Sequence, residues 1–550
     1  MWRVVALLLL LLAVSGALGA HSPSSSSGGL AAGARSLAHG VVGGHITIPL
    51  LEPVSILLKP NECKHIVVTN VSNQTTFVVT QVYTHMQNVT VSLSKSFPAD
   101  ASYTSSSAGV VLMLKPAMFY IQAGEEMVSA VLFALSYTAL DPVPGACNTE
   151  FILENDPSLH LKYNMYETAV MFAPANLGTV RQLPPPACDV KTDVHTRWRL
   201  TYDIYQYFLP ENDLTMESLT KGMSKMSSVQ QIEKNGIKIT TVNSFQQTKI
   251  YGNSYIGTGV IYNVIVRDPH LKTSASYAPV STYACSLPSE GYQCKNSDKN
   301  FIYIQVLCTV IGVYGLILCL IGHRIFEAEF LFFGFLIFGF ISFVLVTRFS
   351  ALNFINRLEI MIAAGLLGGV VVTLVRCIFG IPVPCVVFVG MVLGFLVASI
   401  VFFTPLANFT LFRNDINFWL IFLCVMLVVP TVLIIFPRTL NIITCALVGS
   451  YAVIIAVGVY VYTSLTYIIL NVIKRAIHSD FAKVESDAPF QRRDFILTSI
   501  WAVLFVSGVT LQLILERNRL PFPPCPYDNW RRRRNTVYGE RTPLLRPPEI

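Results

Sequence analysis

Cysteines are the residues of this 550-residue chain whose side chains are best suited to covalent chemistry. Five of the twelve, Cys63, Cys147, Cys188, Cys285 and Cys294, precede a long apolar half. A secretory compartment oxidises thiols to disulfides, and no spacing here resembles a zinc site. Cys285 and Cys294 are close enough in sequence to close a short loop, and Cys147 with Cys188 is the next candidate pair. Cys63 is then left free or bonded elsewhere, because spacing alone leaves the connectivity open.

Three acceptor sequons for N-glycosylation lie close together, at Asn70-Val-Ser, Asn73-Gln-Thr and Asn88-Val-Thr. A fourth, at Asn408, falls in a short loop of the apolar half that lies close to the membrane. Glycans are bulky and hydrophilic, so we expect the acceptors on exposed strand edges or turns. The cluster predicts a glycosylated segment outside the cytosol.

The C-terminal tail carries a motif for sorting. Glu540 is followed, after three spacer residues, by Leu544 and Leu545, an acidic dileucine pattern that clathrin adaptors bind. The basic run from Arg531 to Arg534 precedes it and should attract anionic lipid, at roughly 1 kcal/mol per charge. We therefore predict membrane lipids and a clathrin adaptor as partners of the tail. The alternative for the basic run is a flank that only sets the topology.

Ionisable residues are scarce within the apolar runs. His323, Arg324 and Glu327 fall at the first predicted turn, and we interpret them as a solvated interfacial cluster. Intramembrane charges usually mark proton relays and ion paths, so their scarcity argues against a pump or coupled transporter. We predict no enzymatic activity, no cofactor or metal site and no nucleic-acid partner.

The elements that must position these residues follow from composition. The chain is 53% hydrophobic and only 13% charged, whereas a soluble domain has about 25% charged residues. Residues 1–20 are predicted to be a signal peptide, because Arg3 is followed by a short apolar stretch and then by small residues. Residues 21–44 are rich in Ser, Gly and Ala and predict a flexible leader.

Short segments with alternating or β-branched residues predict a sandwich-like, glycosylated β domain over residues 45–183. Pro184–Pro186 is stiff and marks the expected boundary. A second, α+β unit is expected over residues 190–299, with a helix that begins at Asn212 or Asp213.

Seven apolar runs over residues 300–516 are near the length that a tilted helix needs to cross a bilayer. They are Phe301–Gly322, Glu329–Thr347, Ile360–Val375, Cys385–Thr404, Phe418–Phe436, Asn441–Leu465 and Phe495–Leu515. The predicted fold class is a membrane all-α, seven-helix bundle preceded by a β-rich ectodomain. The N-terminus would be extracellular or lumenal, and the basic tail at residues 517–550 cytosolic. The basic loop at residues 471–494 opposes this orientation under the positive-inside rule, so its side stays open.

Two G-x-x-x-G motifs, Gly365–Gly369 and Gly390–Gly394, occur in the third and fourth runs. Such spacing lets helix backbones approach closely, and we predict that these two spans pack on each other rather than forming a dimer. Pro430 should kink the fifth span.

Several long stretches resemble the transmembrane 7 superfamily member 3 family. They are Asp141–Asn148, Phe172–Gly178, Arg197–Leu214, Gly259–Val266, Phe402–Leu406 and Gly539–Leu545. The resemblance covers the chain from about residue 45 onward, and the membrane half also resembles a wider multipass group that includes a Wnt-receptor-associated scaffold. The resemblance implies a pro-survival membrane protein that attenuates endoplasmic-reticulum stress and the unfolded-protein response. It implies no catalytic residues.

Three functions remain open at this point. The first is a receptor-like or scaffold protein of the plasma membrane or endolysosomal membrane, reached by the secretory pathway, with an unknown extracellular or lumenal partner. The second is a channel or transporter with an uncharged polar pore, which would use Thr404, Asn408, Ser450 and Thr466. The third is a G-protein-coupled-like receptor, which is disfavoured because the third run ends in Val375-Arg376-Cys377 and lacks the expected acidic-Arg-Tyr motif.

Overall fold

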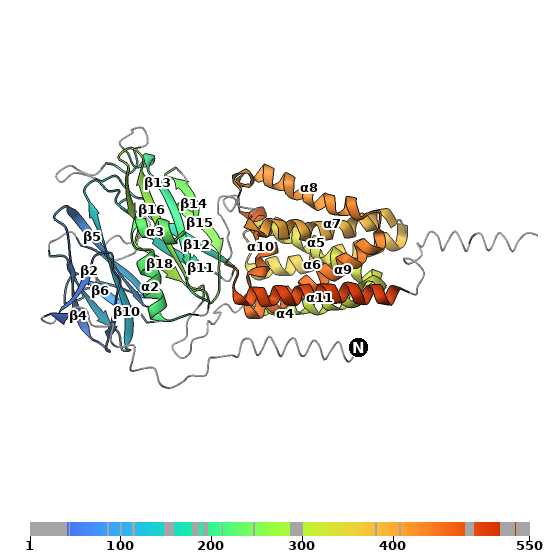
Figure 1. The fold of residues 1–550 in the computed structure, drawn as a ribbon, viewed down its shortest axis with the longest axis horizontal. Helices are drawn as coiled ribbons and strands as arrows, with labels where there is room; N and C mark the ends of the chain where they lie inside the picture. The colour runs from blue at the N-terminus through green and yellow to red at the C-terminus, as the bar shows by residue number, and fades with distance from the viewer. Residues whose placement is uncertain are drawn as a thin grey trace, which may run out of the picture. The chain divides into compact units, whose positions relative to one another are not determined.

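The computed structural model describes residues 41–42, 45–84, 87–99, 102–112, 116–147, 159–164, 166–178, 186–190, 196–211, 213–245, 248–285, 301–379, 382–405, 409–478, 489–517 and 534. They form two compact units, an N-terminal unit built mainly of strands and a helical unit that starts near residue 299 (Figure 1). The predicted signal peptide and most of the predicted leader and basic tail lie outside these residues. Val41–Val42, at the end of the leader, forms strand β1 and pairs with β2.

The first half of the N-terminal unit is a β-sandwich. Its strands are β1 (Val41–Val42), β2 (His45–Pro49), β3 (Val54–Leu58), β4 (Cys63–Thr69), β5 (Thr75–Thr84), β6 (Val89–Ser92), β7 (Ser102–Ser105), β8 (Ser107–Leu112), β9 (Met118–Ala123) and β10 (Val128–Thr138). One sheet has the order β1-β2-β4-β9-β6-β7 and the other β3-β10-β5-β8. Alternation sets the faces: in β9, Phe119 and Ile121 are buried, whereas Met118 and Tyr120 point the other way.

The second half is also a two-sheet structure, with two helices added. Its elements are β11 (Leu159–Tyr163), β12 (Glu167–Phe172), β13 (Thr201–Phe208), α2 (Met216–Lys225), α3 (Val229–Asn235), β14 (Ile237–Asn243), β15 (Lys249–Asn253), β16 (Val260–Asp268), β17 (Thr273–Ser276) and β18 (Val280–Thr282). The sheet orders are β11-β12-β15 and β14-β13-β16-β17, with β18 paired to β16. The helix α2 begins later than predicted, because the Thr215 side chain caps it by accepting from the Ser218 N–H, while Asp213 accepts from Thr215. Asn212 lies outside the described residues.

The boundary between the two halves lies earlier in the chain than Pro184–Pro186, so that prediction is wrong. β11 and β12 precede the prolines, yet β12 pairs with β15 from the second half along Glu167–Met171. The boundary therefore lies before β11, and Pro184–Pro186 falls inside the second half of the N-terminal unit. A strand's sheet depends on distant partners, which local composition does not reveal.

The first sandwich has a core of its own, and a second hydrophobic cluster extends from it into the second sandwich. Phe77, Phe133 and Tyr137 from the first sandwich belong to the same buried cluster as Tyr202 and Tyr277 from the second. At this junction the Tyr137 hydroxyl donates to the Ser276 carbonyl oxygen at 2.7 Å, and the Tyr83 hydroxyl donates to that of Pro279. Because large aromatic side chains are buried across the junction, the two sandwiches form one rigid body.

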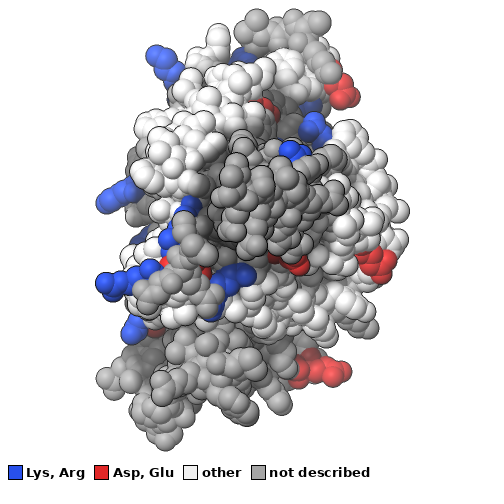
Figure 2. Space-filling view, turned by 90° about the vertical axis from the view of Figure 1, so that its right-hand side faces the viewer, with Lys and Arg blue, Asp and Glu red and all other residues white. Residues whose placement is uncertain are grey.

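The helical unit contains seven helices long and apolar enough to cross a membrane, which confirms the predicted number within the described residues. They are α4 (Phe301–Ile321), α5 (Phe326–Phe349), α6 (Phe354–Phe379), α7 (Pro382–Phe403), α8 (Asp415–Leu433), α9 (Pro437–Val461) and α11 (Arg492–Glu516). In α9, 72% of the most apolar stretch is buried, against 17–50% in the other six, so α9 is the central helix. Most of the described surface visible in Figure 2 carries no charged side chain.

Both G-x-x-x-G motifs pack within the chain, but not on each other as predicted. A Cβ atom added to Gly369 of α6 would lie 2.5 Å from the Leu331 carbonyl oxygen of α5. A Cβ on Gly390 of α7 would lie 2.5 Å from the Pro430 side chain in α8. A Cβ on Gly394 would lie closer still to the Met426 carbonyl oxygen of α8. The third span therefore packs on the second and the fourth on the fifth, because each motif faces its neighbour in a helical hairpin.

A short amphipathic helix, α10 (Tyr467–Ile477), follows the central helix and overlaps the start of the basic loop at residues 471–494. The Lys474 side chain is buried with its Nζ 4.9 Å from the Tyr467 ring centroid. Arg475 pairs with Asp415 at 3.3 Å and lies 3.7 Å above the Phe418 ring centroid, and Arg493 donates to the Val461 carbonyl oxygen. These cations hold the helical unit together at this end, where they are partly withdrawn from solvent.

Candidate functional site

The three clustered sequons lie on the first sandwich, and their asparagine side chains are all exposed. Asn70 and Asn88 lie just outside strands, and Asn73 lies in a turn. Asn70 also has a positive φ of 63°, a left-handed conformation that Asn tolerates well. The positions therefore suit glycan acceptors, and their occupancy stays a prediction. Asn408 lies outside the described residues.

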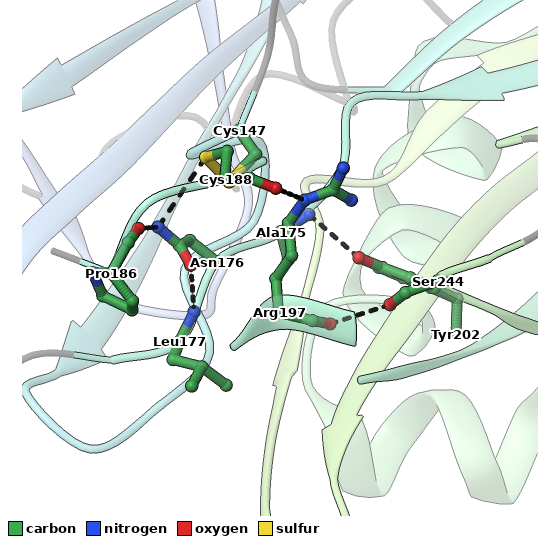
Figure 3. The surroundings of a disulfide bond; sticks show 9 residues. All are labelled: Cys147, Ala175, Asn176, Leu177, Pro186, Cys188, Arg197, Tyr202 and Ser244. Carbon is green, nitrogen blue, oxygen red and sulfur yellow. Dashed lines mark hydrogen bonds between the residues drawn. A yellow bond between two sulfur atoms is a disulfide. The ribbon is translucent and has the colours of Figure 1, made fainter. Parts of the chain in front are cut away.

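Cys147 and Cys188 form a disulfide with a Cα–Cα distance of 5.7 Å, which confirms that prediction. Figure 3 shows the side chains of Asn176 and Arg197 on either side of it. Asn176 donates to the Pro186 carbonyl oxygen at 2.8 Å, and the Arg197 Nε donates to that of Cys188 at 2.8 Å. The disulfide thus joins the start of the second sandwich to the segment that leads into β13.

Two other cysteines of the N-terminal unit, Cys63 and Cys285, lie within the described residues. Cys285 takes part in a disulfide, but its predicted partner Cys294 lies outside the described residues, so that pairing stays a prediction. Cys63 is free and exposed at the start of β4. Burial raises the pKa of its thiol, and Lys95 opposes this shift.

An exposed aromatic surface lies beside the Cys147–Cys188 disulfide. The rings of Trp198 and Phe245 stack with centroids 5.0 Å apart, and the Arg197 guanidinium lies 4.0 Å above the Trp198 ring. Phe245 is 69% exposed, more than any other large apolar side chain described in the N-terminal unit. Stacked aromatic and arginine side chains are enriched at the centres of protein interfaces, so this surface is a candidate binding site.

An ion-pair network stabilises the sheet of the second sandwich. Asp203 accepts from Lys238 Nζ, Thr241 Oγ1 and Arg267 Nε at 2.7–2.8 Å. Burial would raise the pKa of the Asp203 carboxyl, but these hydrogen bonds outweigh it and lower the pKa. A lowered pKa stabilises the fold above the unfolded-state value of about 3.9, and that stability is lost as the pH falls through the folded-state value. The network therefore survives mildly acidic compartments.

A buried polar cluster inside the helical unit was missed by sequence reasoning. The Asn441 side chain of α9 donates to Glu329 Oε2 of α5 at 3.0 Å and lies 3.1 Å from His323 Nδ1. The Gln512 side chain of α11 donates to the Cys319 carbonyl oxygen of α4 at 2.7 Å. It also accepts from the backbone N–H of His323 at 3.4 Å. Four helices thus meet through these side chains.

The prediction of a solvated interfacial cluster is wrong for His323, which is only 4% exposed, whereas Arg324 and Glu327 are exposed as predicted. Glu329, which was not part of that prediction, is fully buried, so it and His323 face the interior of the helical unit. Glu329 Oε1 and Asn441 Oδ1 have no hydrogen-bond partner, which leaves two buried acceptors without a donor. A buried ionisable residue in a membrane helix usually has a function or a binding partner. The one signal in the sequence was Glu329 at the start of the second apolar run.

Of the four polar residues suggested for an uncharged pore, the three that the structure describes have hydrogen-bond partners within the chain. Ser450 accepts from the Trp501 indole at 3.0 Å and donates to the Leu447 carbonyl oxygen at 3.0 Å. Thr404 and Thr466 donate to the carbonyl oxygens of Val401 and Thr463, at 2.6 and 2.8 Å. Their hydroxyl groups thus donate hydrogen bonds to nearby backbone carbonyl oxygens.

No three His, Cys, Asp or Glu side chains in the described part of the chain gather closely enough to hold a metal ion.

The residues of the sorting motif, Glu540, Leu544 and Leu545, lie outside the described part of the chain.

Seven apolar helices after two joined sandwiches define a multipass membrane protein with a β-rich N-terminal region. Three family profiles match: a "TM7SF3-like, N-terminal immunoglobulin-like domain" at residues 44–137, a "TM7SF3-like, second immunoglobulin-like domain" at residues 142–288, and a "TM7S3/TM198-like domain" at residues 308–513. The first two agree with the two sandwiches and with the corrected boundary. The chain belongs to the transmembrane 7 superfamily member 3 family.

Curated relatives agree with this assignment. Transmembrane 7 superfamily member 3 from Mus musculus is 42% identical over 97% of this chain and 92% of its own length. The Homo sapiens relative is 42% identical over 84% of this chain and 82% of its own length. A solved β-1,2-glucanase from Parabacteroides distasonis has a TM-score of 0.14 and 10% identity over 50% of this chain, too low to indicate a common fold.

We predict opposite effects for two substitutions in the buried cluster. Asn441→Ala should lower the stability by about 1–3 kcal/mol, because it leaves Glu329 without its donor. Glu329→Gln should preserve or raise it, because a carboxamide costs less to bury than a carboxylate and its oxygen can still accept from Asn441. The measurement is the thermal unfolding midpoint of the full chain in detergent.

Thr510→Val is the matched control, because Thr510 is an exposed polar residue on the same helix as Gln512 and bonds only to its own helix. It should leave the midpoint unchanged. A Glu329→Gln variant as unstable as Asn441→Ala would show that the charged carboxylate itself is needed.

Proposed function

We propose that this chain is a non-enzymatic, receptor-like or scaffold protein whose N-terminal unit binds a partner while the helical unit anchors it. The observation that carries the proposal is the buried cluster common to the two immunoglobulin-like domains. A common buried cluster holds the surfaces of both domains in a fixed arrangement, which lowers the entropic cost of binding. The exposed stack of Trp198, Phe245 and Arg197 is the candidate centre of that surface.

The proposed orientation places the N-terminal unit outside the cytosol and the tail inside it. The Cys147–Cys188 disulfide and the exposed sequons support this orientation, since disulfides and glycans belong to the secretory pathway. The basic loop is the opposing feature, but Lys474 and Arg475 are engaged in contacts within the helical unit. We propose the plasma membrane, the endolysosomal membrane or both as the location.

The cellular role that we propose is attenuation of endoplasmic-reticulum stress and of the unfolded-protein response, with a pro-survival effect. It rests on the family resemblance rather than on a feature of the fold. The structure does, however, offer a way to test whether the role depends on the N-terminal unit.

In cells that lack the protein, an unfolded-protein-response reporter should rise further under stress than in wild-type cells. The full chain should restore the reporter level, whereas a Cys147→Ser/Cys188→Ser variant should restore little of it. The reason is that the disulfide holds the start of the second domain beside the candidate binding surface. The reporter is measured together with the glycosidase-sensitive mobility of the protein, which reports on its glycans and export.

Cys63→Ser is the matched control, because Cys63 is free and exposed, and it should restore the reporter fully. A reporter that is indifferent to loss of the protein would remove the stress-related role. Full rescue by the double cysteine variant, exported normally, would instead show that the disulfide-held surface is not the functional part.

The second candidate function is a channel or transporter with an uncharged pore, and the third is a G-protein-coupled-like receptor. The intramolecular hydrogen bonds of Thr404, Ser450 and Thr466 make the pore less favoured, because these hydroxyl groups serve the backbone. Nothing in the described helices favours the receptor alternative over a scaffold.

For the tail, we propose clathrin-adaptor binding through Glu540, Leu544 and Leu545, with delivery to endolysosomal membranes. Leu544→Ala/Leu545→Ala should shift the protein from internal compartments to the cell surface, several-fold by surface labelling. Pro547→Ala, in the same tail but outside the motif, is the control. An unchanged distribution of the dileucine variant would contradict adaptor sorting.

A further inference from the structure

Two histidines and a methionine meet on the outer face of the six-stranded sheet. Strand β2 pairs in parallel with β4, which places His45 opposite His65. Strand β4 pairs antiparallel with β9, which places His65 opposite Tyr120 and Val67 opposite Met118. Since side chains alternate along strands, all three residues project from the face opposite the buried core.

The side chains touch. His45 Nδ1 and His65 Nδ1 are 3.3 Å apart, with the two rings edge to face. The other nitrogen of the same ring, His65 Nε2, is 3.3 Å from Met118 Sδ. Tyr120 stacks on His65 with the ring centroids 4.8 Å apart, which limits the orientations of the His65 ring. His45 and Met118 remain exposed, so an ion can reach the cluster.

In the structure His65 faces its two neighbours through different ring nitrogens, Nδ1 toward His45 and Nε2 toward Met118. A single ion shared by all three residues therefore requires one His65 nitrogen to lie near both neighbours. A half-turn of the His65 ring about its Cβ–Cγ bond would exchange Nε2 with Cε1. Nε2 would then lie between His45 Nδ1 and Met118 Sδ, so all three donors could address one ion.

We propose that the outer face of this sheet binds one copper ion through His45, His65 and Met118. Imidazole suits several transition metals, but a thioether is a soft ligand that selects copper, above all Cu(I). A zinc site would call for three donors of the His, Cys or carboxylate type, and the described residues gather no such set. Because the three residues come from three separate strands, their positions in the sequence carry no metal motif.

The test uses the full chain in detergent or nanodiscs, with Cys63→Ser as the background in every sample to remove the nearby free thiol. Cu(I) is titrated anaerobically against a chromophoric chelator, and Cu(II) is followed by electron paramagnetic resonance. We expect His65→Ala to weaken binding of both ions by at least about tenfold, and His45→Ala to act in the same direction. Met118→Leu should weaken Cu(I) binding far more than Cu(II) binding.

Two matched controls lie elsewhere on the N-terminal unit. His270→Ala removes an exposed histidine, and Met127→Leu removes a methionine that is 56% exposed; both should leave copper binding unchanged. Unaltered thermal unfolding of each apo variant shows that the fold is intact. The proposal is overturned if the His45→Ala/His65→Ala variant keeps the copper stoichiometry and affinity of the background chain, or if the controls lose as much affinity as the site variants.

Discussion

The helical unit depends on the close approach of helix backbones at glycines. Gly315 of α4 meets Gly449 of α9, Gly369 of α6 meets α5, and Gly390 of α7 meets α8 at Pro430. Lipid tails are as apolar as the side chains, so burial of apolar surface does not drive these contacts, and close packing must do so instead. The helices that pair in this way also make the most extensive contacts in the unit. Such packing suits an anchor whose interior is filled.

The N-terminal unit is held together by a different force, the burial of aromatic and aliphatic side chains between two sandwiches. Phe133 and Tyr137 from one domain and Tyr277 from the other are almost fully buried in the same cluster. The Cys147–Cys188 disulfide then fixes the segment that carries the exposed aromatic surface. A buried cluster common to both domains suits the binding role that we propose for the N-terminal unit.

Local patterns in the sequence predicted the features that depend on local physics. Apolar runs located all seven helices, because lipid tolerates few alternatives to a helix. Strand alternation indicated a sandwich, and the Cys147–Cys188 pair was correct. The errors concern distant partners: β12 joins β15 across the prolines, and Gly369 faces Leu331 rather than the fourth span. The Glu329–Asn441 contact and the contact of His65 with Met118 could not be predicted, because each joins elements far apart in the chain.

We propose that the helical unit is a packed membrane anchor and that the N-terminal unit performs the function of the protein by binding a partner. Reconstitution of the purified full chain into proteoliposomes, followed by ion and small-solute flux measurements, tests this claim most directly. We expect flux no greater than in empty liposomes. The described glycines bring paired helices into close backbone contact, and the hydroxyl groups of Ser450 and Thr404 donate to backbone carbonyl oxygens. Reproducible, saturable and substrate-specific flux would contradict this proposal and favour the transporter alternative.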